Sequence, residues 1–358
     1  MLNYFGKNYG YKALTDRVGN FSQLAGARRY AFSCGRSKGV EAVDIRTGTG
    51  LNYTILPDRA LDIAFAEFKG IPLGFMSPAG VVAAQYYDPT DNEWLRSFSG
   101  GLMTTCGLSN VGAASELNGI KYGQHGRISN LPVENTIVEE GFDGREYVIS
   151  VKGQVRQVKP FFENMVLHRT IQSYAGKNMI MIRDVVENRG ASRQPFMLLY
   201  HFNFGFPLVN EHSGIFIPNR NKTCTHQKKE FDLTGFDRFK NPEEGFEEQT
   251  FFFETIPDQN GDAHFLLAND RDSPELAIKV KYSYNPLNRL VVWKYLNEKN
   301  YVLCVEPANC HVKGIAYEYG NGTLQYLEPS EKKEINIEIE VLEGKEEINR
   351  TVNMLKLA

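Results

Sequence analysis

The chain has 358 residues, of which 40 are basic and 43 acidic, and its formal net charge is −3. Because the two signs are well mixed, no basic patch indicates a nucleic-acid partner or an anionic membrane surface. No run of about 18 apolar residues predicts a membrane span, and the first residues lack the layout of a secretory signal. These features predict a cytoplasmic protein that binds neither nucleic acid nor membrane.

Five cysteines are scattered along the chain, and their odd number and irregular spacing do not fit a zinc framework. We expect reduced thiols, most of which fill core space as small hydrophobic side chains. Aromatic residues are plentiful, with 23 Phe and 18 Tyr. Both β-sheet proteins and sugar-binding sites favour them, so this abundance alone does not decide between the two.

Residues 1–40 have a mixed pattern from which no regular element can be assigned. After them, residues 40–46 predict a short strand, and residues 51–56 and 61–65 predict two strands separated by a polar turn. This turn contains Arg59. It is either a plain connection or a loop that projects polar side chains into a site.

Between residues 74 and 119 the chain is rich in Gly, Ala, Ser and Asn. Such segments rarely form regular elements, and their glycines let the backbone approach a ligand or another strand closely. A further segment, residues 123–127, places His125 between two nearby glycines. Loops of this kind carry functional residues more often than core segments do.

From residue 135 onward, alternating apolar and polar residues predict a nearly continuous series of strands. The predicted strands cover residues 136–138, 147–151, 154–158, 165–174, 179–187, 250–254, 264–268, 276–282, 290–295, 301–306 and 334–342. Residues 219–249 carry charges without apolar periodicity, which predicts a long solvent-facing excursion. Near the end of the chain, Ile348, Val352 and Leu355 have the spacing of one helix face.

The strand series runs through the middle of the chain without a linker, and no alternating strand-helix units or fixed-period repeats interrupt it. The sequence therefore predicts an all-β, mainly antiparallel sandwich with few helices. We expect a single domain over residues 1–358. It would begin with an N-terminal segment, residues 1–40, and end with a short helix within residues 345–358.

The strand predicted over residues 196–207 is the most informative stretch of the chain. With a period of two, one face is wholly apolar, and the other begins apolar and then carries His201, Asn203 and Gly205. This pattern is typical of a strand that leaves the core and reaches the floor of a pocket. His201 is either a functional residue of that pocket or a buried histidine bonded to a backbone carbonyl.

A second informative strand covers residues 301–306. Glu306 shares a face with Val302 and Cys304 and directly precedes Pro307, which we expect to stop the strand ladder. A carboxyl group at that position would be partly desolvated, and desolvation raises its pKa toward that of a useful base. The alternative is a glutamate at a strand end that meets water or an arginine.

Several short motifs occur in one order along the chain. They are Asp58-Arg59-Ala60-Leu61-Asp62, Arg96-Ser97-Phe98-Ser99-Gly100-Gly101, His125-Gly126-Arg127, Asp184-Val185-Val186-Glu187-Asn188-Arg189-Gly190, Leu198-Leu199-Tyr200-His201-Phe202-Asn203-Phe204-Gly205, Trp293-Lys294 and Cys304-Val305-Glu306-Pro307. In combination, over residues 40–342, they resemble the aldose 1-epimerase or galactose mutarotase-like superfamily. The likeness is greatest to an uncharacterised bacterial branch of it.

This resemblance implies a β-supersandwich of the galactose mutarotase type and a carbohydrate isomerase that interconverts sugar anomers. His201 resembles the histidine that protonates the sugar ring oxygen. Glu306 resembles the glutamate that removes the proton from the anomeric hydroxyl. Arg96 and His125 resemble the residues that hold sugar hydroxyls.

Further candidates for sugar binding lie in the same motifs, namely Arg59, Asn203, Trp293 and Lys294. The chain also departs from the best-known mutarotases, which place an asparagine four residues after the histidine, whereas Asn203 follows by two. The aspartate that grips a sugar hydroxyl has no clear counterpart, and Asp262 is a guess for it. The resemblance thus implies a reaction type and leaves the sugar open.

Opening a cyclic hemiacetal requires one proton given to the ring oxygen and one taken from the anomeric oxygen. An acid and a base on opposite sides of a small concave space suffice, so we expect no metal or organic cofactor and a small-molecule carbohydrate as the partner. Other hypotheses fit the same residues. His125, His201 and Glu306 could form a metal site for sugar isomerisation, or the chain could be a carbohydrate-binding sensor without catalysis. A glycoside hydrolase is a weaker option, because no second carboxylate has a credible spacing.

Overall fold

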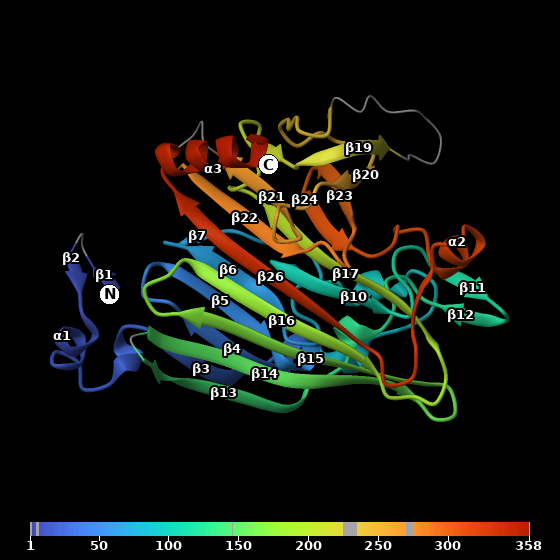
Figure 1. The fold of residues 1–358 in the computed structure, drawn as a ribbon, viewed down its shortest axis with the longest axis horizontal. Helices are drawn as coiled ribbons and strands as arrows, with labels where there is room; N and C mark the ends of the chain where they lie inside the picture. Colours follow the sequence, from blue (N-terminus) through green and yellow to red (C-terminus); the bar gives the residue numbers. More distant parts are fainter. Residues whose placement is uncertain (1, 5–6, 145, 225–234, 270–274, 358) are drawn as a thin grey trace.

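A computed structural model describes residues 2–4, 7–144, 146–224, 235–269 and 275–357. In this part of the chain the dominant features are two large antiparallel sheets, one of 12 strands and one of eight, packed face to face (Figure 1). The expected all-β, mainly antiparallel fold is confirmed. Among the described residues, no helix is both long and apolar enough to span a membrane.

The larger sheet holds strands from both ends of the described chain. In spatial order its main path is β19 (Asn219–Cys224), β20 (Gln249–Thr255), β23 (Arg289–Asn297), β24 (Asn300–Ala308), β17 (Gln194–Gly205), β10 (Met103–Leu108), β6 (Asp62–Phe68), β5 (Leu51–Leu56), β4 (Glu41–Arg46) and β3 (Gly26–Ala31). Two short strands extend this path, β25 (Gln325–Leu327) beside β17 and β7 (Ile71–Pro72) beside β6. β17 and β24 are therefore neighbours although about 100 residues separate them in sequence.

The second sheet covers one face of the first. In spatial order its strands are β13 (Glu134–Asp143), β14 (Glu146–Lys159), β15 (Glu163–Tyr174), β16 (Met179–Asn188), β26 (Lys332–Glu343), β22 (Leu276–Ser283), β21 (Asp262–Asn269) and β18 (Gly214–Phe216). The remaining strands form two-stranded ribbons in the described chain, β1 (Leu2–Tyr4) with β2 (Lys7–Tyr9), β8 (Phe75–Met76) with β9 (Gly100–Gly101), and β11 (Ser115–Leu117) with β12 (Ile120–Tyr122).

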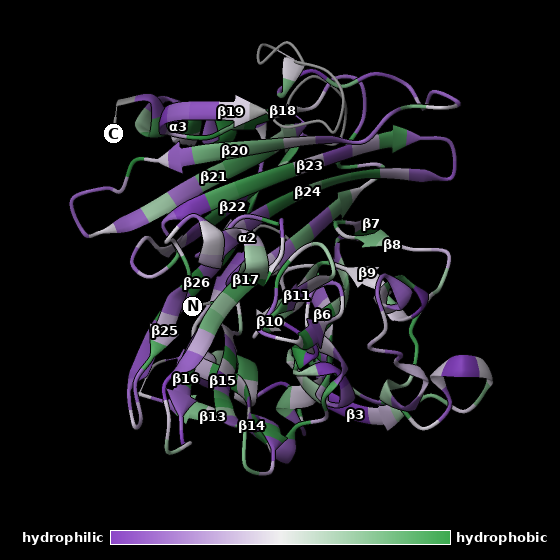
Figure 2. Ribbon diagram, turned by 90° about the vertical axis from the view of Figure 1, so that its right-hand side faces the viewer, coloured by the Kyte–Doolittle hydropathy of each residue, from purple (hydrophilic) through white to green (hydrophobic). Residues whose placement is uncertain are grey.

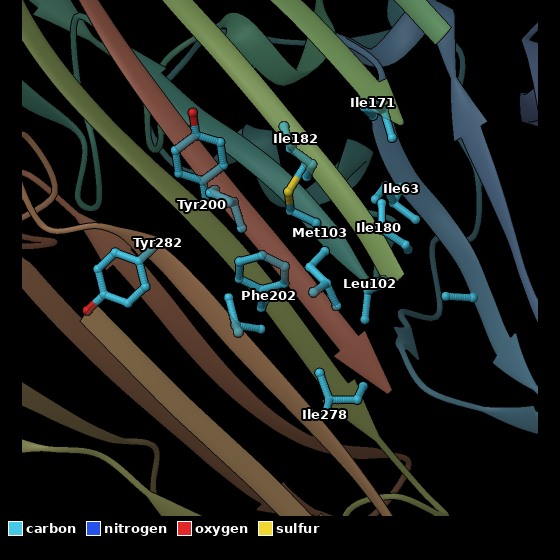
Figure 3. Close-up of a cluster of buried hydrophobic side chains, with 14 of the residues drawn as sticks. Ile63, Leu102, Met103, Ile171, Ile180, Ile182, Tyr200, Phe202, Ile278 and Tyr282 are labelled. Carbon is cyan, nitrogen blue, oxygen red and sulfur yellow. The ribbon is translucent and has the colours of Figure 1, made fainter. Parts of the chain in front are cut away.

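The main core lies between the two large sheets, where the inward-facing residues of both interdigitate. Figure 3 shows Tyr200 and Phe202 of β17 in this layer, together with Ile182 from β16 and Ile278 from β22. The alternation along most of β26 explains its place in the sheet. Ile335, Ile337, Ile339 and Val341 are buried in the core, while the residues between them are more exposed. Figure 2 shows mostly hydrophobic residues along β23, which is likewise buried over most of its length.

The described helices are short and few. They are α1 (Tyr11–Thr15), α2 (Ile315–Gly320) and α3 (Lys345–Leu357), with 3₁₀ turns η1 (Phe21–Gln23), η2 (Gly35–Ser37), η3 (Pro57–Arg59), η4 (Ala84–Tyr86), η5 (Glu93–Ser97) and η6 (Ile128–Asn130). The expected C-terminal helix is present as α3. Its buried residues Ile348, Val352 and Leu355 pack on Leu266 and Leu342 of the second sheet, the apolar face predicted from their spacing.

Two segments form strands that the sequence pattern did not predict. Residues 26–31, inside the N-terminal segment that was left unassigned, form β3 at the edge of the large sheet. Residues 219–224, expected in a solvent-facing excursion, form β19 and pair with β20. Cross-strand partners gave both segments a β conformation that their own sequence pattern did not indicate. Residues 225–234 of that excursion lie outside the described residues.

Glycines bring the β8–β9 ribbon close to the larger sheet, as the glycine-rich composition suggested. Gly100 and Gly101 have φ of +74° and +82°, and a Cβ at Gly101 would lie 2.6 Å from the carbonyl oxygen of Ile63 on β6. At Gly205, where β17 ends, a Cβ would lie 3.2 Å from Phe75 of β8. The ribbon therefore crosses this face of the sheet at backbone contact distance.

Candidate functional site

Two neighbouring strands, β17 and β24, present the polar residues that the sequence singled out. In their antiparallel register Asn203 lies opposite Cys304, and Phe202 lies opposite Val305. Because side chains alternate across a strand, His201, Asn203, Cys304 and Glu306 all project from the same face of the sheet. Phe202 projects from the other face, into the core between the sheets.

His201 and Glu306 are in direct contact. The distance between His201 Nε2 and Glu306 Oε1 is 3.0 Å, and their side chains are only 7% and 2% exposed. The other ring nitrogen, Nδ1, lies 2.6 Å from Asn203 Oδ1. Asn203 Nδ2 in turn donates to the backbone oxygen of His201 at 2.9 Å, which fixes the side-chain amide and makes Oδ1 the acceptor. Nδ1 therefore carries a hydrogen, and Nε2 faces the carboxyl group.

Burial determines where the proton of this pair resides. Desolvation raises the pKa of Glu306 to about 8. Desolvation also lowers the pKa of His201 to about 4, and the hydrogen bond that His201 donates to Asn203 partly offsets this lowering. Near neutral pH both groups are uncharged, so the 3.0 Å contact joins a neutral carboxyl group and a neutral imidazole rather than a carboxylate and an imidazolium.

Two details differ from the sequence-based expectation. The imidazole and the carboxyl group were expected on opposite sides of a concave space, but adjacent strands place them in contact on one face. The strand was also expected to stop at Pro307. β24 instead continues through Ala308, and Pro307 keeps its register position opposite Leu290 of β23.

An aromatic cluster lies against the His201–Glu306 pair. The ring of Phe98, just after η5, has its centroid 5.4 Å from that of His201, and the ring of His125 lies 5.5 Å from it, edge-on. Trp94 stacks on Phe98 at 4.8 Å and contacts His125 at 4.7 Å. Trp94 is buried, whereas Phe98 is half-buried. The rings of Phe98 and His125 thus lie against the imidazole of the pair.

The structure brings His125 to the pair, as the sequence suggested. Its backbone has a φ of +55°, and its Nδ1 accepts a 3.4 Å hydrogen bond from the Gly112 amide. Burial, followed by the nearby His201, lowers the pKa of His125 to about 3. The His125 ring is thus neutral at neutral pH. Because Nδ1 accepts a hydrogen bond, Nε2 carries the hydrogen and can donate a hydrogen bond to a ligand.

Arg59, another expected site residue, lies in a supporting position. It is buried, and its guanidinium donates to the backbone oxygens of Ser129, Val82 and Ser97. Ser97 ends η5, directly before Phe98, and the hydroxyl of Ser129 accepts from the Trp94 indole. Arg59 therefore holds the segments that carry the aromatic cluster, and its donors are used on backbone carbonyls.

Arg96, Lys294 and Asp262 are not brought to the pair. The Arg96 side chain is 72% exposed and pairs with Glu93. Lys294 projects from the opposite face of β23, where its Nζ donates to the backbone oxygens of Gly235 and Arg238. Asp262 begins β21 in the other sheet. Strand alternation thus turns Lys294 away from the site, and the fold places Asp262 in the other sheet.

Trp293 shares the face of the pair. It lies opposite Cys304 in the β23–β24 register and stacks with Tyr295 at 5.7 Å, while its indole donates to Glu248 at 2.9 Å. The stacked pair forms an aromatic surface on the same side of the sheet as Glu306. Such a surface suits the apolar face of a sugar ring.

The metal-ligating side chains group differently from the His125, His201 and Glu306 set considered from sequence. Within the described residues, ligand atoms of His201, Cys304 and Glu306 all lie within 4.8 Å of one another. His125 is not part of this group. Cys304 was missed as a ligand because a thiol in an apolar strand normally fills space.

A separate groove of about 610 Å³ lies over strands β3 to β6 and β8. Its lining includes Arg28, Tyr30, Phe65 and Phe75 and does not include His201 or Glu306. The pair is therefore a buried contact, and the groove is a distinct depression elsewhere on the molecule.

Behind the pair, a buried ionic network joins the two sheets, and the sequence analysis did not identify it. Arg169 of β15 donates to Asp184 of β16 at 2.6 Å, to Asp62 of β6 at 3.2 Å and to Thr105 of β10 at 2.8 Å. The Tyr200 hydroxyl donates to Asp184 at 2.6 Å. The sequence did contain a signal for this network. Arg169 and Asp184 each occupy an inward-facing position on β15 and β16, two strands that a hairpin turn joins.

Comparison with solved structures supports the fold. A candidate aldose 1-epimerase from Klebsiella pneumoniae is 20% identical, with a TM-score of 0.85, over 94% of this chain and 90% of that one. A galactose mutarotase-like protein from Clostridium acetobutylicum is 13% identical, with a TM-score of 0.59, over 90% and 99%. A galactose 1-epimerase from Lactobacillus acidophilus is 14% identical, with a TM-score of 0.57, over 89% and 99%. The chain thus has the galactose mutarotase-like fold.

A search of curated protein sequences found no match. The model of one protein family, described as a domain of unknown function (DUF4432), matches residues 37–341. This match begins just before β4 and ends within β26, so it includes β17, β24 and both members of the pair. The chain therefore belongs to the DUF4432 family.

Proposed function

We propose that this protein is a carbohydrate isomerase that interconverts the anomers of an aldose or a sugar derivative. The observation that carries the proposal is the 3.0 Å contact between His201 and Glu306 on a fold shared with proteins named for this reaction. The pair holds one exchangeable proton between a base and an acid. Anomer exchange needs two such groups and no cofactor.

The proton balance of ring opening matches the two states of the pair. In the ionic state, the His201 imidazolium gives a proton to the ring oxygen, and the Glu306 carboxylate takes one from the anomeric hydroxyl. The products are an open-chain sugar and the neutral pair. After rotation about the terminal carbon–carbon bond, the reverse transfers close the ring and regenerate the ionic state. The neutral state, which burial favours through the pKa shifts of both groups, is thus the partner of the open-chain sugar.

A sugar must reach a pair that is almost wholly buried. Phe98 is half-buried and lies against the imidazole, so it is the side chain that an entering sugar would displace. The stacked Trp293 and Tyr295 offer a platform for the ring on the same face of the sheet. The hydroxyl groups of the bound sugar would then solvate the pair, which is otherwise buried from water, and so favour its ionic state.

Substitution of the pair tests the proposal. His201→Ala and Glu306→Gln should each fold, as judged by circular dichroism, and each should slow anomer exchange by about 10²- to 10⁴-fold. A matched control is His168→Ala. His168 lies on the second sheet, and its Nε2 is 3.4 Å from Glu187 Oε2, so this variant removes a histidine from another histidine–glutamate contact. This control should keep wild-type rates. Wild-type exchange in both pair variants would overturn the proposal.

The substrate is found by screening aldoses, uronic acids and phosphorylated sugars with anomer-exchange NMR. The expected result is exchange of at least one sugar well above its rate in buffer. Calorimetric binding of a sugar without accelerated exchange would instead identify a carbohydrate-binding protein that has no isomerase activity.

A further inference from the structure

We propose that His201, Cys304 and Glu306 form a binding site for a borderline divalent cation such as Zn²⁺, and that a bound cation blocks proton exchange by the pair. The binding itself stands independently of the isomerase function. The block rests on that proposed function. Nitrogen, sulfur and oxygen from these three residues already lie within 4.8 Å of one another.

The ligand types and their spacing fit Zn²⁺. Zinc binds imidazole nitrogen and carboxylate oxygen at about 2.0–2.2 Å and thiolate sulfur at about 2.3 Å, so ligand atoms of one tetrahedral ion lie about 3.3–3.7 Å apart. His201 Nε2 and Glu306 Oε1, now 3.0 Å apart, would separate slightly to admit the ion. Cys304 Sγ would move closer by about an ångström or less, which a χ1 adjustment allows.

The surroundings of His201 match those of a metal-bound histidine. Such a histidine usually donates its other ring N–H to a carbonyl or carboxylate oxygen, which orients the ring. Asn203 Oδ1 accepts from Nδ1 at 2.6 Å, so Nε2, which lies 3.0 Å from Glu306 Oε1, keeps its lone pair for a ligand. The same oxygen lies 3.4 Å from Cys304 Sγ, so one amide side chain holds two of the three ligands.

The charge balance of the site also suits a divalent cation. Binding would displace the thiol proton of Cys304 and the carboxyl proton of Glu306, and the two anionic ligands would neutralise the two charges of the ion. His201 contributes a neutral lone pair. Three protein ligands leave the fourth position of a tetrahedral ion for water or a sugar hydroxyl.

The pair cannot exchange protons with a sugar while the cation is bound. The ion uses the Nε2 lone pair and the carboxylate oxygen that otherwise share the proton, so neither group can accept or give a proton while the ion is bound. The expected consequence is that Zn²⁺ inhibits anomer exchange and that a chelator restores it.

Metal titration of chelator-treated full-length protein tests the site. With Zn²⁺ in calorimetry and Co²⁺ or Cd²⁺ in absorption, we expect one equivalent bound and a thiolate-to-metal charge-transfer band. Cys304→Ser should abolish the band, and Glu306→Gln should weaken binding by about 10- to 100-fold. Cys34→Ser removes an exposed thiol and should change neither. The two test variants act through different ligands, so the test survives if one of them does not fold.

Several outcomes would overturn the inference. A band that persists in Cys304→Ser or disappears in Cys34→Ser would place the metal on another thiol, and an absence of binding would remove the site while leaving the isomerase proposal intact. Chelator-treated protein that is inactive until Zn²⁺ is added would keep the metal site but overturn cofactor-free proton exchange and the proposed block.

Discussion

At the scale of single residues, the site is an imidazole held between an amide and a carboxyl group. Asn203 fixes which nitrogen of His201 carries the hydrogen, and Glu306 faces the nitrogen that does not. The two-residue spacing of His201 and Asn203 places both side chains on one face of β17. A spacing of two therefore lets the asparagine orient the imidazole directly.

Replacement of Asn203 tests this orientation. Asn203→Ala removes the acceptor for Nδ1–H, so the ring can adopt the other tautomer, and we expect kcat to fall by about 10- to 100-fold with little change in KM. Asn203→Asp keeps an acceptor oxygen and should recover most of the loss. Steady-state anomer exchange with chelator-treated protein measures both. Equal losses in the two variants would show that the acceptor at this position does not orient His201.

The raised pKa of Glu306 gives a pH-dependent term in stability. Between its ordinary pKa of 4.5 and about 8, the folded protein binds this proton more strongly than the unfolded chain does. Stability therefore falls as pH rises through that window, with a limiting slope of about 1.4 kcal/mol per pH unit. Glu306→Gln removes this contribution.

Unfolding by urea at several pH values between 5 and 8, with chelator present, measures this contribution. Glu306→Gln should gain stability relative to the wild type as pH rises. A difference between the two proteins that stays constant over this range would show that Glu306 ionises normally in the folded state.

At the scale of elements, η5 and the residue after it cover the pair. The resemblance assigned sugar binding to Arg96 in this segment, yet the structure exposes Arg96 and places Phe98 against His201. Arg59 bonds the Ser97 carbonyl and Trp94 stacks on Phe98, so the end of η5 is anchored on both sides. These contacts fix the backbone at the end of η5 and so position the half-buried Phe98 ring against His201.

Phe98→Ala should open the cover of the pair. Loss of the ring lets water approach His201 and Glu306, which reduces the desolvation that raises the pKa of Glu306. We expect the upper end of the pH range over which the stability of this variant varies to move to lower pH. We also expect KM for the sugar to change more than kcat. Leu95→Ala, which removes an exposed apolar side chain from the same turn, is the matched control. An unchanged KM and pH profile would contradict a covering role for Phe98.

At the scale of the whole molecule, the two sheets are joined by apolar packing and by the Arg169 network. Arg169 and Asp184 lie opposite each other on β15 and β16, and both face inward. From there Arg169 reaches Asp62 of the larger sheet, and Tyr200 of β17 reaches Asp184. The strand that carries His201 is thus hydrogen-bonded to the second sheet at the preceding residue.

Arg169→Met should therefore be strongly destabilising. It would leave two buried carboxyl groups without their cation, and breaking a buried ion pair in this way costs about 3–5 kcal/mol. Arg183→Ala, on the adjacent strand, removes an ion pair with Glu334 whose side chains are 65% and 49% exposed, and should cost less than about 1 kcal/mol. Urea unfolding of the two variants compares them. Similar losses would show that the network contributes no more than a surface ion pair.

The sequence by itself determined the fold class and most of the strands, and it singled out the two residues that the structure places in contact. Period-two alternation is a local property of a half-buried strand, so β15, β16 and β26 could be predicted from their own residues. His201 and Glu306 were visible because each interrupts an apolar face. The edge strands β3 and β19 could not be predicted, because their partners rather than their composition make them strands.

Only the tertiary structure decided how the polar residues combine. Strand order brings β17 beside β24, and register then sets His201 against Glu306 and adds Cys304, which its own strand presents as an ordinary core residue. The same alternation turns Lys294 away from the site. The pairing partner of a strand, its register and the face that becomes the site depend on contacts between residues far apart in sequence. A periodic pattern indicates only which side chains of one strand are buried.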